Sequence, residues 1–436
     1  MKKLNKVLLL FCILIGISQL KAQETKKLTL EEAIEMGLKN SKNLKIDAAK
    51  ISQATADLLE AKNRQLPDFK LSASYLRLGN ANVDLKFLDP NSGNSTPTPN
   101  SALIGQANLS LPLYAGGKIK YGIESAKYLV EASKLRSENN KMAIAYNIAE
   151  AYNNLFKSEQ AITVLKENLS VAEKRDATFL KLENNGLLAR NDRLKANLQT
   201  SNIELQILEA KNNYSIASIN MNLLLGLPEM TILEVDDAYL NDKNELSLVD
   251  FYLNSAMENR KDIQSLTMQR KAAELGTRSA KAENLPTIAL TGGYIAADVP
   301  KILTVYNAVN IGVGINYNLG NIWKKNSSLM MSEAMEDELA ANNDLLNDQI
   351  KLEINKDYQN VLYSNEKVVV YEKTAAQAIE NYRIVQKKFD NGLATITELL
   401  DAEAAKISTD VNVINAKADA TLSYKKLQKT SGILTK

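Results

Sequence analysis

Two long stretches of this chain contain almost none of the residues that interrupt a helix. Residues 117–184 include no proline, and after the first position their only glycine is Gly122. Residues 320–390 include no proline and no glycine after the first position. A helix rises about 1.5 Å per residue, so the 68 residues of the first stretch would reach about 100 Å. No compact domain has a core of that length, so these helices are expected to pack on one another or on neighbouring chains as coiled coils.

The two stretches belong to a plan that occurs twice. The segments "ENNGLL" and "FDNGLA" place glycines at positions 186 and 392, which are 206 residues apart. The earlier segments "AKNRQLP" and "AKAENLP" end at Pro67 and Pro286, which are 219 residues apart. The difference of 13 residues matches residues 89–101, a loop rich in Pro, Gly, Ser and Asn that only the first copy contains. Spacing this consistent indicates an internal duplication.

The duplication defines the expected domains. Residues 23–228 form the first structural repeat, residues 229–245 a linker, and residues 246–436 the second repeat. Each repeat is predicted to contain a helix, two strands joined by a loop, and two long helices joined by a turn. The opening helices are expected at residues 30–65 and 248–284.

Residues 1–22 are typical of a secretory signal peptide. A basic start precedes an apolar segment of about eleven residues, Val7–Ile17, and Leu20-Lys21-Ala22 provides the cleavage site. A membrane-spanning helix needs about 20 apolar residues, so this shorter segment predicts export. Cleavage after Ala22 leaves 49 basic and 51 acidic residues, a balance that argues against a nucleic-acid partner.

Composition and motifs argue against enzymatic chemistry. The chain has no His, and its single Cys, Cys12, lies inside the apolar segment of the signal peptide. Imidazole catalysis, imidazole or thiolate metal sites and disulfides are therefore excluded for the mature chain. No P-loop, dinucleotide fingerprint or nucleophile elbow is present. We expect that the protein is not an enzyme and that it binds no cofactor and no metal.

Four shorter segments change to a period of two residues. They cover residues 68–75, 103–113, 287–294 and 307–320. Apolar residues on one side and small polar residues on the other, over runs of about 9–11 residues, suit the strands of a membrane β-barrel. An ordinary half-buried soluble hairpin has the same pattern, and the strands alone do not decide between the two.

Four strands are too few to close a barrel, because the smallest barrels have about eight. An open sheet in lipid would leave its edge groups without hydrogen bonds. If these are membrane strands, several chains must therefore share one barrel, and three chains would give twelve strands.

Specific motifs now support a family resemblance. The segment "LPLYAGGK" at residues 111–118 marks a passage from strand to helix, and both "NG" turns are followed by an acid and Leu-x-Ala. With the duplicated architecture, these features make the whole mature chain similar to the outer-membrane efflux proteins, the TolC-like channels. The second repeat departs from the pattern, with "YNLGNIWKK" at its strand-to-helix junction. The expected junction residues are Pro67, Pro112, Gly116, Gly117, Pro286 and Gly320.

The resemblance implies a mostly helical fold with a membrane β-barrel. Long antiparallel helical hairpins would form an α-barrel, and four β-strands per chain would form one third of a trimeric 12-stranded barrel. The expected location is the outer membrane of a Gram-negative bacterium, in contact with outer-membrane lipid and with a long periplasmic extension.

The same resemblance implies a function and partners. A homotrimer would conduct substrates passively from a periplasmic adaptor protein and an inner-membrane transporter to the outside. The alternative is a periplasmic coiled-coil scaffold without channel activity.

The turns at Gly186 and Gly392 are expected to be helix ends in which glycine adopts positive φ. The resemblance places both at the periplasmic tip of the channel. It also places acids six and nine residues after the glycine at a constriction, which here are Glu398 and Asp401. Glu398 has a local explanation as well, because Thr395-x-x-Glu398 is a capping box, and Asp401 could be a solvated acid of the first turn.

The first repeat differs at the matching positions. It carries Asp192 and Lys195, with Arg190 and Arg193 beside them. This asymmetry suggests that Arg190, Arg193 or Lys195 pairs with Glu398 or Asp401 between adjacent helical pairs and keeps the tip shut. An exposed pair contributes only about 0–1 kcal/mol, so threefold repetition would matter.

Overall fold

The computed structural model describes residues 25–79, 98–241, 245–300 and 302–434. The predicted signal peptide and most of the predicted 89–101 loop lie outside these residues. The chain forms two compact units. The sheet unit comprises residues 47–136 and 262–345, and the hairpin unit comprises residues 1–46, 137–261 and 346–436.

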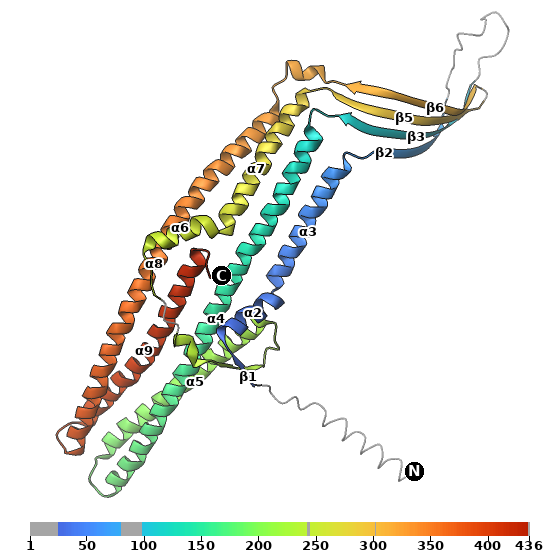
Figure 1. Ribbon diagram of the computed structural model, residues 1–436. Helices are drawn as coiled ribbons and strands as arrows, with labels where there is room; N and C mark the ends of the chain where they lie inside the picture. The colour runs from blue at the N-terminus through green and yellow to red at the C-terminus, as the bar shows by residue number, and fades with distance from the viewer. Residues whose placement is uncertain (1–24, 80–97, 242–244, 301, 435–436) are drawn as a thin grey trace, which may run out of the picture. The chain divides into compact units, whose positions relative to one another are not determined.

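The sheet unit contains a four-stranded antiparallel sheet (Figure 1). Its order is β2-β3-β5-β6, so the strands of both repeats join in one sheet. The strands are β2 (Asp68–Arg77), β3 (Ser101–Tyr114), β5 (Thr287–Val299) and β6 (Leu303–Asn316). Each of the four predicted segments coincides with a strand, although β5 extends five residues beyond the predicted end and β6 begins and ends four residues earlier than predicted.

The strand register separates two kinds of face. One row of paired residues consists of Leu71, Ala107, Tyr294 and Val309. The neighbouring row consists of Lys70, Asn108, Gly293 and Asn310. Because successive side chains point to opposite faces, these rows lie on opposite sides of the sheet. The apolar side is left uncovered, and Ile311, for example, is 81% exposed.

The sheet also has two open edges within the described residues. β2 pairs only with β3, and β6 pairs only with β5. Each edge therefore presents unpaired backbone N–H and C=O groups.

The opening helix of each repeat is broken, so the prediction of single helices at 30–65 and 248–284 was wrong. The first repeat has α2 (Leu30–Asn40) and α3 (Lys42–Asn63). The second has α6 (Val249–Asn259) and α7 (Lys261–Lys281), followed by the short helix η3 (Ala282–Asn284). Ser41 and Arg260 separate the helices, and each has an extended ψ of 122°.

Tertiary packing accounts for these breaks, since neither position is a proline or a glycine. The residue before each break lies against a glycine that ends a long helix. A Cβ on Gly226 would lie 2.9 Å from the Cβ of Asn40, and one on Gly432 would lie 3.2 Å from the Cβ of Asn259. The Asn40 side-chain amide also donates to the carbonyl of Leu225 (2.7 Å).

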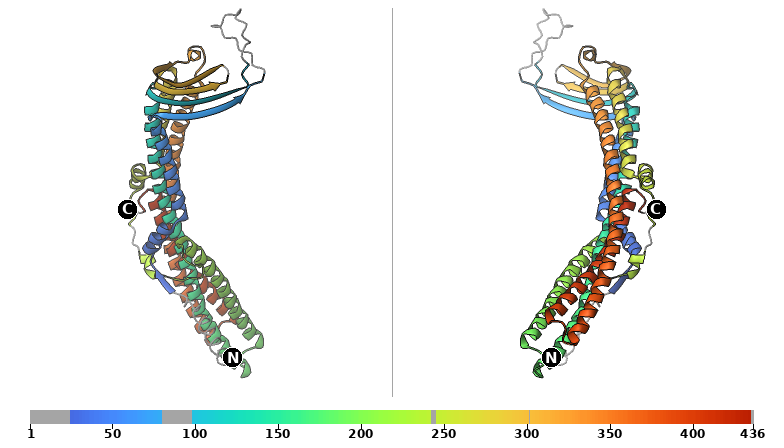
Figure 2. Two further views of the ribbon diagram at one scale, coloured as in Figure 1. Left: turned by 90° about the vertical axis from the view of Figure 1, so that its right-hand side faces the viewer. Right: turned by 90° about the vertical axis from the view of Figure 1, so that its left-hand side faces the viewer.

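Two long helical hairpins contribute to the hairpin unit, and Figure 2 shows their lower ends side by side in both views. They are α4 (Lys118–Asn184) with α5 (Arg190–Leu225), and α8 (Ser327–Asp390) with α9 (Ile396–Thr430). The predicted first long helix is confirmed. The second begins seven residues later than predicted, after the short helix η4 (Leu319–Ile322). Asn326 caps its start, because its side-chain oxygen accepts from the N–H of Leu329 (3.0 Å).

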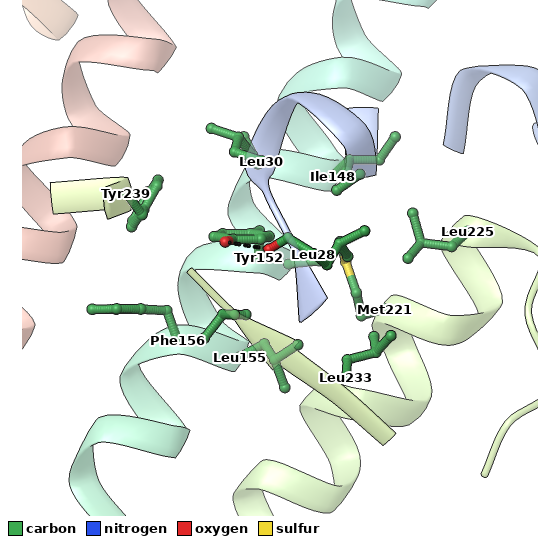
Figure 3. Packing of buried hydrophobic residues seen from close by; sticks show 14 of the residues in the cluster. Leu28, Leu30, Ile148, Tyr152, Leu155, Phe156, Met221, Leu225, Leu233 and Tyr239 are labelled. Atoms are coloured by element: carbon green, nitrogen blue, oxygen red, sulfur yellow. Dashed lines mark hydrogen bonds between the residues drawn. The ribbon is translucent and has the colours of Figure 1, made fainter. Parts of the chain in front are cut away.

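The largest core of the hairpin unit surrounds a small parallel sheet that was not predicted (Figure 3). Strand β1 (Thr25–Leu28) pairs with β4 (Ile232–Val235), just before the short helix η2 (Asp237–Asn241). The hydroxyl of buried Tyr152 donates to the Leu28 carbonyl (2.8 Å) and accepts from the Asp236 N–H (2.9 Å). One α4 side chain thus connects β1 and the residue that follows β4 to the long helix.

No helix among the described residues combines the length and apolar character needed to cross a bilayer.

Candidate functional site at the hairpin turns

Both long hairpins reverse through the same turn geometry. Gly186 and Gly392 have φ of 71° and 72°, which costs glycine little because it has no Cβ. The N–H of Leu187 donates to the Leu182 carbonyl (2.8 Å), and the N–H of Leu393 donates to the Lys388 carbonyl (2.7 Å). In each case the N–H donates to the carbonyl five residues earlier, which is the hydrogen bond that defines a Schellman motif at a helix C-terminus.

The return helices start differently. At α9, Thr395 and Glu398 form a complete capping box, in which the Glu398 carboxylate accepts from the Thr395 N–H (2.7 Å). At α5, Ala189 occupies the capping position and provides no side-chain hydrogen bond. The Thr395 N–H, followed by its hydroxyl, lowers the pKa of Glu398 from its ordinary value.

The predicted constriction acids lie outside the core of their own chain. On the first turns of α9, the buried side chains are Ile396, Leu399 and Ala402. Glu398 and Asp401 are exposed and three residues apart, so they are neighbours on the solvent side of the helix. Both side chains therefore face the solvent around this chain, and one carboxylate oxygen of Glu398 is held by the capping box.

Within the chain, two of the predicted partner cations bind acids of their own hairpin. Arg193 forms an ion pair with Glu183, and Lys195 lies 3.2 Å from Asp192. Arg190 forms no ion pair with another described residue. The predicted pairs with Glu398 or Asp401 do not form among the described residues of this chain, and such a pair between copies stays a prediction.

A buried ion pair close to the turns was not found from the sequence. Arg175 of α4 pairs with Glu403 of α9, and their side chains are only 9% and 3% exposed. Lys157 of α4 and Asp419 of α9 form a second, more exposed pair at 2.8 Å. Both pairs connect the α4–α5 hairpin to the α8–α9 hairpin.

Aromatic side chains surround the buried pair. The rings of Phe179 and Phe389 lie 5.5 Å apart between centroids. Tyr382 is partly buried in the same cluster, and burial, followed by the charge of Glu403, raises its pKa. A cavity of about 290 Å³ is lined by these three aromatic residues and by Arg175, among others.

The predicted junction residues lie at the ends of the sheet. Pro67 and Pro286 immediately precede β2 and β5, where they fix the entry from helix to strand. Pro112 lies at a register shift in β3. Gly116 and Gly117 have positive φ between β3 and α4, at 62° and 89°, whereas Gly320 lies inside η4.

The family model "Outer membrane efflux protein" matches the chain twice, over residues 33–227 and 252–432. The outer membrane protein TolC of Escherichia coli (strain K12) is 20% identical over 453 residues, covering 100% of this chain and 87% of that protein. The TolC of Salmonella enteritidis is 22% identical over 438 residues, covering 96% of this chain and 83% of that protein.

Two solved structures show the same fold. The outer membrane protein VceC of Vibrio cholerae superposes with a TM-score of 0.76 at 19% identity, covering 92% of this chain and 96% of that one. The CmeC outer membrane channel of Campylobacter jejuni gives a TM-score of 0.75 at 20% identity, covering 93% of this chain and 86% of that one.

Proposed function

Because the chain belongs to the outer membrane efflux protein family, we propose that it is the exit duct of a tripartite efflux or secretion system. In this role it conducts substrates passively across the outer membrane. A periplasmic adaptor and an inner-membrane transporter deliver those substrates and supply the energy. In this proposal the transporter, and not the duct, selects the substrate.

The four-stranded sheet is the observation that carries this proposal. Its apolar face is exposed, which is unfavourable in water, and its two edges are open, which is unfavourable in lipid unless other strands pair with them. All neighbouring strands are antiparallel, so β2 and β6 run in opposite directions. The β6 edge of one copy can therefore pair antiparallel with the β2 edge of the next. Three copies give a closed barrel with the apolar face in lipid and the polar face around the pore.

Unpaired apolar stripes on the hairpins favour the same assembly. Leu194, Leu198, Leu205 and Leu208 are exposed along α5 at spacings of four, seven and three residues. Leu352, Leu362 and Val369 are exposed along α8. Spacings of this kind are typical of coiled-coil seams, so neighbouring copies would cover both stripes in a trimer.

The proposed gate lies at the hairpin turns. Three copies would bring Glu398 and Asp401 into a ring of six carboxylates, which favours cations. Asp192 adds a third acid, and Arg190 has no ion pair within the described chain, which leaves it available to a neighbouring copy. Contacts between copies at this ring would keep the periplasmic end narrow.

The test is single-channel recording from the full mature protein in planar bilayers. We expect a cation-preferring channel, and we expect E398A/D401A to increase conductance and weaken the cation preference. D348A is the matched control, because Asp348 is an exposed α8 acid that lies far from the turns in sequence. Unchanged conductance and selectivity in E398A/D401A would refute the gate.

The channel itself is tested by the wild-type protein. A detergent-requiring trimer in the outer-membrane fraction supports the proposal. A monodisperse species that is soluble without detergent and gives no conductance would instead support the periplasmic scaffold.

A further inference from the structure

We propose that the end of the sheet farthest from the helices forms an apolar binding site inside the pore, which holds the apolar parts of amphipathic solutes as they leave the duct. We call this site the apolar collar, and it consists of the large apolar residues at that end of the pore-facing side, Leu76, Ile104, Val299, Leu303 and Val305. The inference rests on the proposed duct function. The transporter still selects the substrates, and the collar defines the class of solute that the outer mouth would bind.

Near the helices, the pore-facing side of the sheet is polar. The first row of paired residues there consists of Asp68, Ser110, Thr291 and Gly312. The second row consists of Lys70, Asn108, Gly293 and Asn310. Lys70 and Asp68 form an ion pair at 2.9 Å, and both side chains are more than half exposed. This part of the lumen would be well hydrated.

The same side of the sheet becomes apolar toward its other end. The third row is mixed and consists of Ser72, Gln106, Ile295 and Ala308. The fourth row consists of Ser74, Ile104, Ala297 and Val305. The outermost pairs on this side are Leu76 with Ala102 and Val299 with Leu303. These three rows contain no charged residue, so polarity falls along the strands from the helices to the far end.

The opposite side of the sheet changes polarity in the reverse direction. Near the helices it carries apolar residues such as Leu71. At the far end it carries the pairs Arg77–Ser101 and Asp298–Thr304, and the Thr304 hydroxyl donates to the Asp298 carboxylate (2.9 Å). In the proposed barrel, a polar outer surface at this height places the strand ends beyond the hydrocarbon. The collar lies at that height on the inner side, so contact with lipid does not explain its apolar residues.

The collar side chains keep apolar surface that their own chain does not cover. Leu76 is 47% exposed and Leu303 is 54% exposed. The other three members, Ile104, Val299 and Val305, are half-buried. A trimer would repeat all five around the axis, because residues at equal height recur in each copy. Removal of apolar surface from water is favourable, so a solute with an apolar part would be stabilised there.

The residues next to the collar give the site its preference for amphipathic solutes. Ser74 lies in the same row as Ile104, and Ser72 and Gln106 lie in the next row toward the helices. Their hydroxyl and amide groups can bind the polar part of a solute whose apolar part contacts the collar. Sites for small organic molecules combine an apolar lining with a few polar groups in this way. A small inorganic ion has no apolar part and gains nothing from the collar.

The experiment measures how two organic cations block the potassium current of the full mature protein in planar bilayers. Tetraethylammonium and tetrabutylammonium carry the same single charge, so the proposed carboxylate ring attracts both. Each methylene that leaves water improves affinity about fourfold. With two of the additional methylenes in contact with the collar, we expect tetrabutylammonium to block the wild type at a concentration about 15 times lower than tetraethylammonium.

The test variant is V299T/V305T, which replaces two collar methyl groups with hydroxyls and keeps the branched shape of both side chains. We expect the ratio of blocking concentrations to fall to about fourfold or less. The matched control is V309T/V313T, which makes the same change on the lipid-facing side, where Val309 and Val313 are 77% and 62% exposed. It should keep the wild-type ratio. If V299T/V305T fails to assemble, L303N decides the test, because Leu303 is the first residue of β6 and is more than half exposed.

The outcomes separate this inference from the proposed function. Absence of any wild-type conductance would refute the duct itself. A conducting wild type that both ions block at equal concentrations would refute only the collar. An unchanged ratio in V299T/V305T, or an equal fall in the control, would also refute it, because the ions would then bind elsewhere. All these variants keep the hairpin turns, so a difference between them does not arise at the proposed gate.

Discussion

Four glycines with nearly the same backbone conformation allow a controlled test of the packing inferred here. Gly186, Gly226, Gly392 and Gly432 end the long helices with φ between 71° and 75°. They differ in what a methyl group would meet. Nothing lies within 4 Å at Gly186 and Gly392, whereas the Cβ of Asn40 lies at 2.9 Å for Gly226. Alanine substitution therefore separates the cost of the backbone conformation from the cost of a steric clash.

The expected magnitudes follow from these distances. Alanine in the left-handed region costs about 1 kcal/mol, and this term is common to all four positions. At Gly226 the clash with Asn40 adds overpacking of about 1–3 kcal/mol, and displacement of Asn40 weakens its hydrogen bond to Leu225. We expect G226A to lower the free energy of unfolding by about 3 kcal/mol and G186A by about 1 kcal/mol. G432A should fall between them, because its nearest contact is 3.2 Å.

The assay is urea unfolding of the detergent-solubilised protein, followed by far-UV circular dichroism, together with hydrogen exchange of the α2 amides. G226A should increase exchange in α2, because Asn40 ends that helix. G186A is the control for the backbone term and should leave α2 unchanged. Equal losses of stability in G186A and G226A would refute the close packing of the α2–α3 break against the end of α5.

Two further predictions concern single side chains. Y152F should lower the free energy of unfolding by about 2 kcal/mol, because it leaves the Leu28 carbonyl and the Asp236 N–H without the hydroxyl that joins them. The control is Y363F, at an exposed tyrosine of α8. An equal loss of stability in both variants would contradict the bridging role of Tyr152. The lowered pKa of Glu398 means that its stabilisation of the α9 start is fully present above the ordinary Glu pKa and is lost as pH falls through the lowered value. Exchange protection at the Glu398 amide, corrected for intrinsic rates, should therefore fall in the wild type as the pH drops below the ordinary Glu pKa of about 4.3. In E398Q this protection should not change with pH.

The long helices and their turns were predictable because local chemistry determines them. The absence of Pro and Gly over residues 117–184 leaves helix as the favourable state, and Gly186 then ends it. The strand segments were predictable because their alternation matches a sheet with one apolar face. In these regions local preference and tertiary structure agree.

The broken opening helices were not predictable, because their cause lies far away in the sequence. Ser41 and Arg260 are both compatible with a continuous helix. The breaks reflect the close approach of Asn40 to Gly226 and of Asn259 to Gly432. The sequence indicates that these glycines end other helices, but it does not indicate which residues pack against them.

The Arg175–Glu403 pair was missed for a similar reason. Its members are 228 residues apart, and each resembles the solvated charges that cover the rest of the helices. The one available signal lay in the alignment of the two repeats. The positions that match Arg175 and Glu403 are Asn381 and Asn197, and neither carries a charge. The sheet of β1 and β4 had no such signal, since four residues with two adjacent lysines show no alternation.

The two open sheet edges have a consequence for how variation acts on this protein. In the proposed assembly, further copies of the same chain complete the wall, so no position in that wall can be altered only once. A substitution on the polar face, at Lys70 or Asn310 for example, would recur at equal height around the axis. Mutation of the gene would therefore change a whole ring of the proposed pore, and asymmetric variants would require two different genes in one cell.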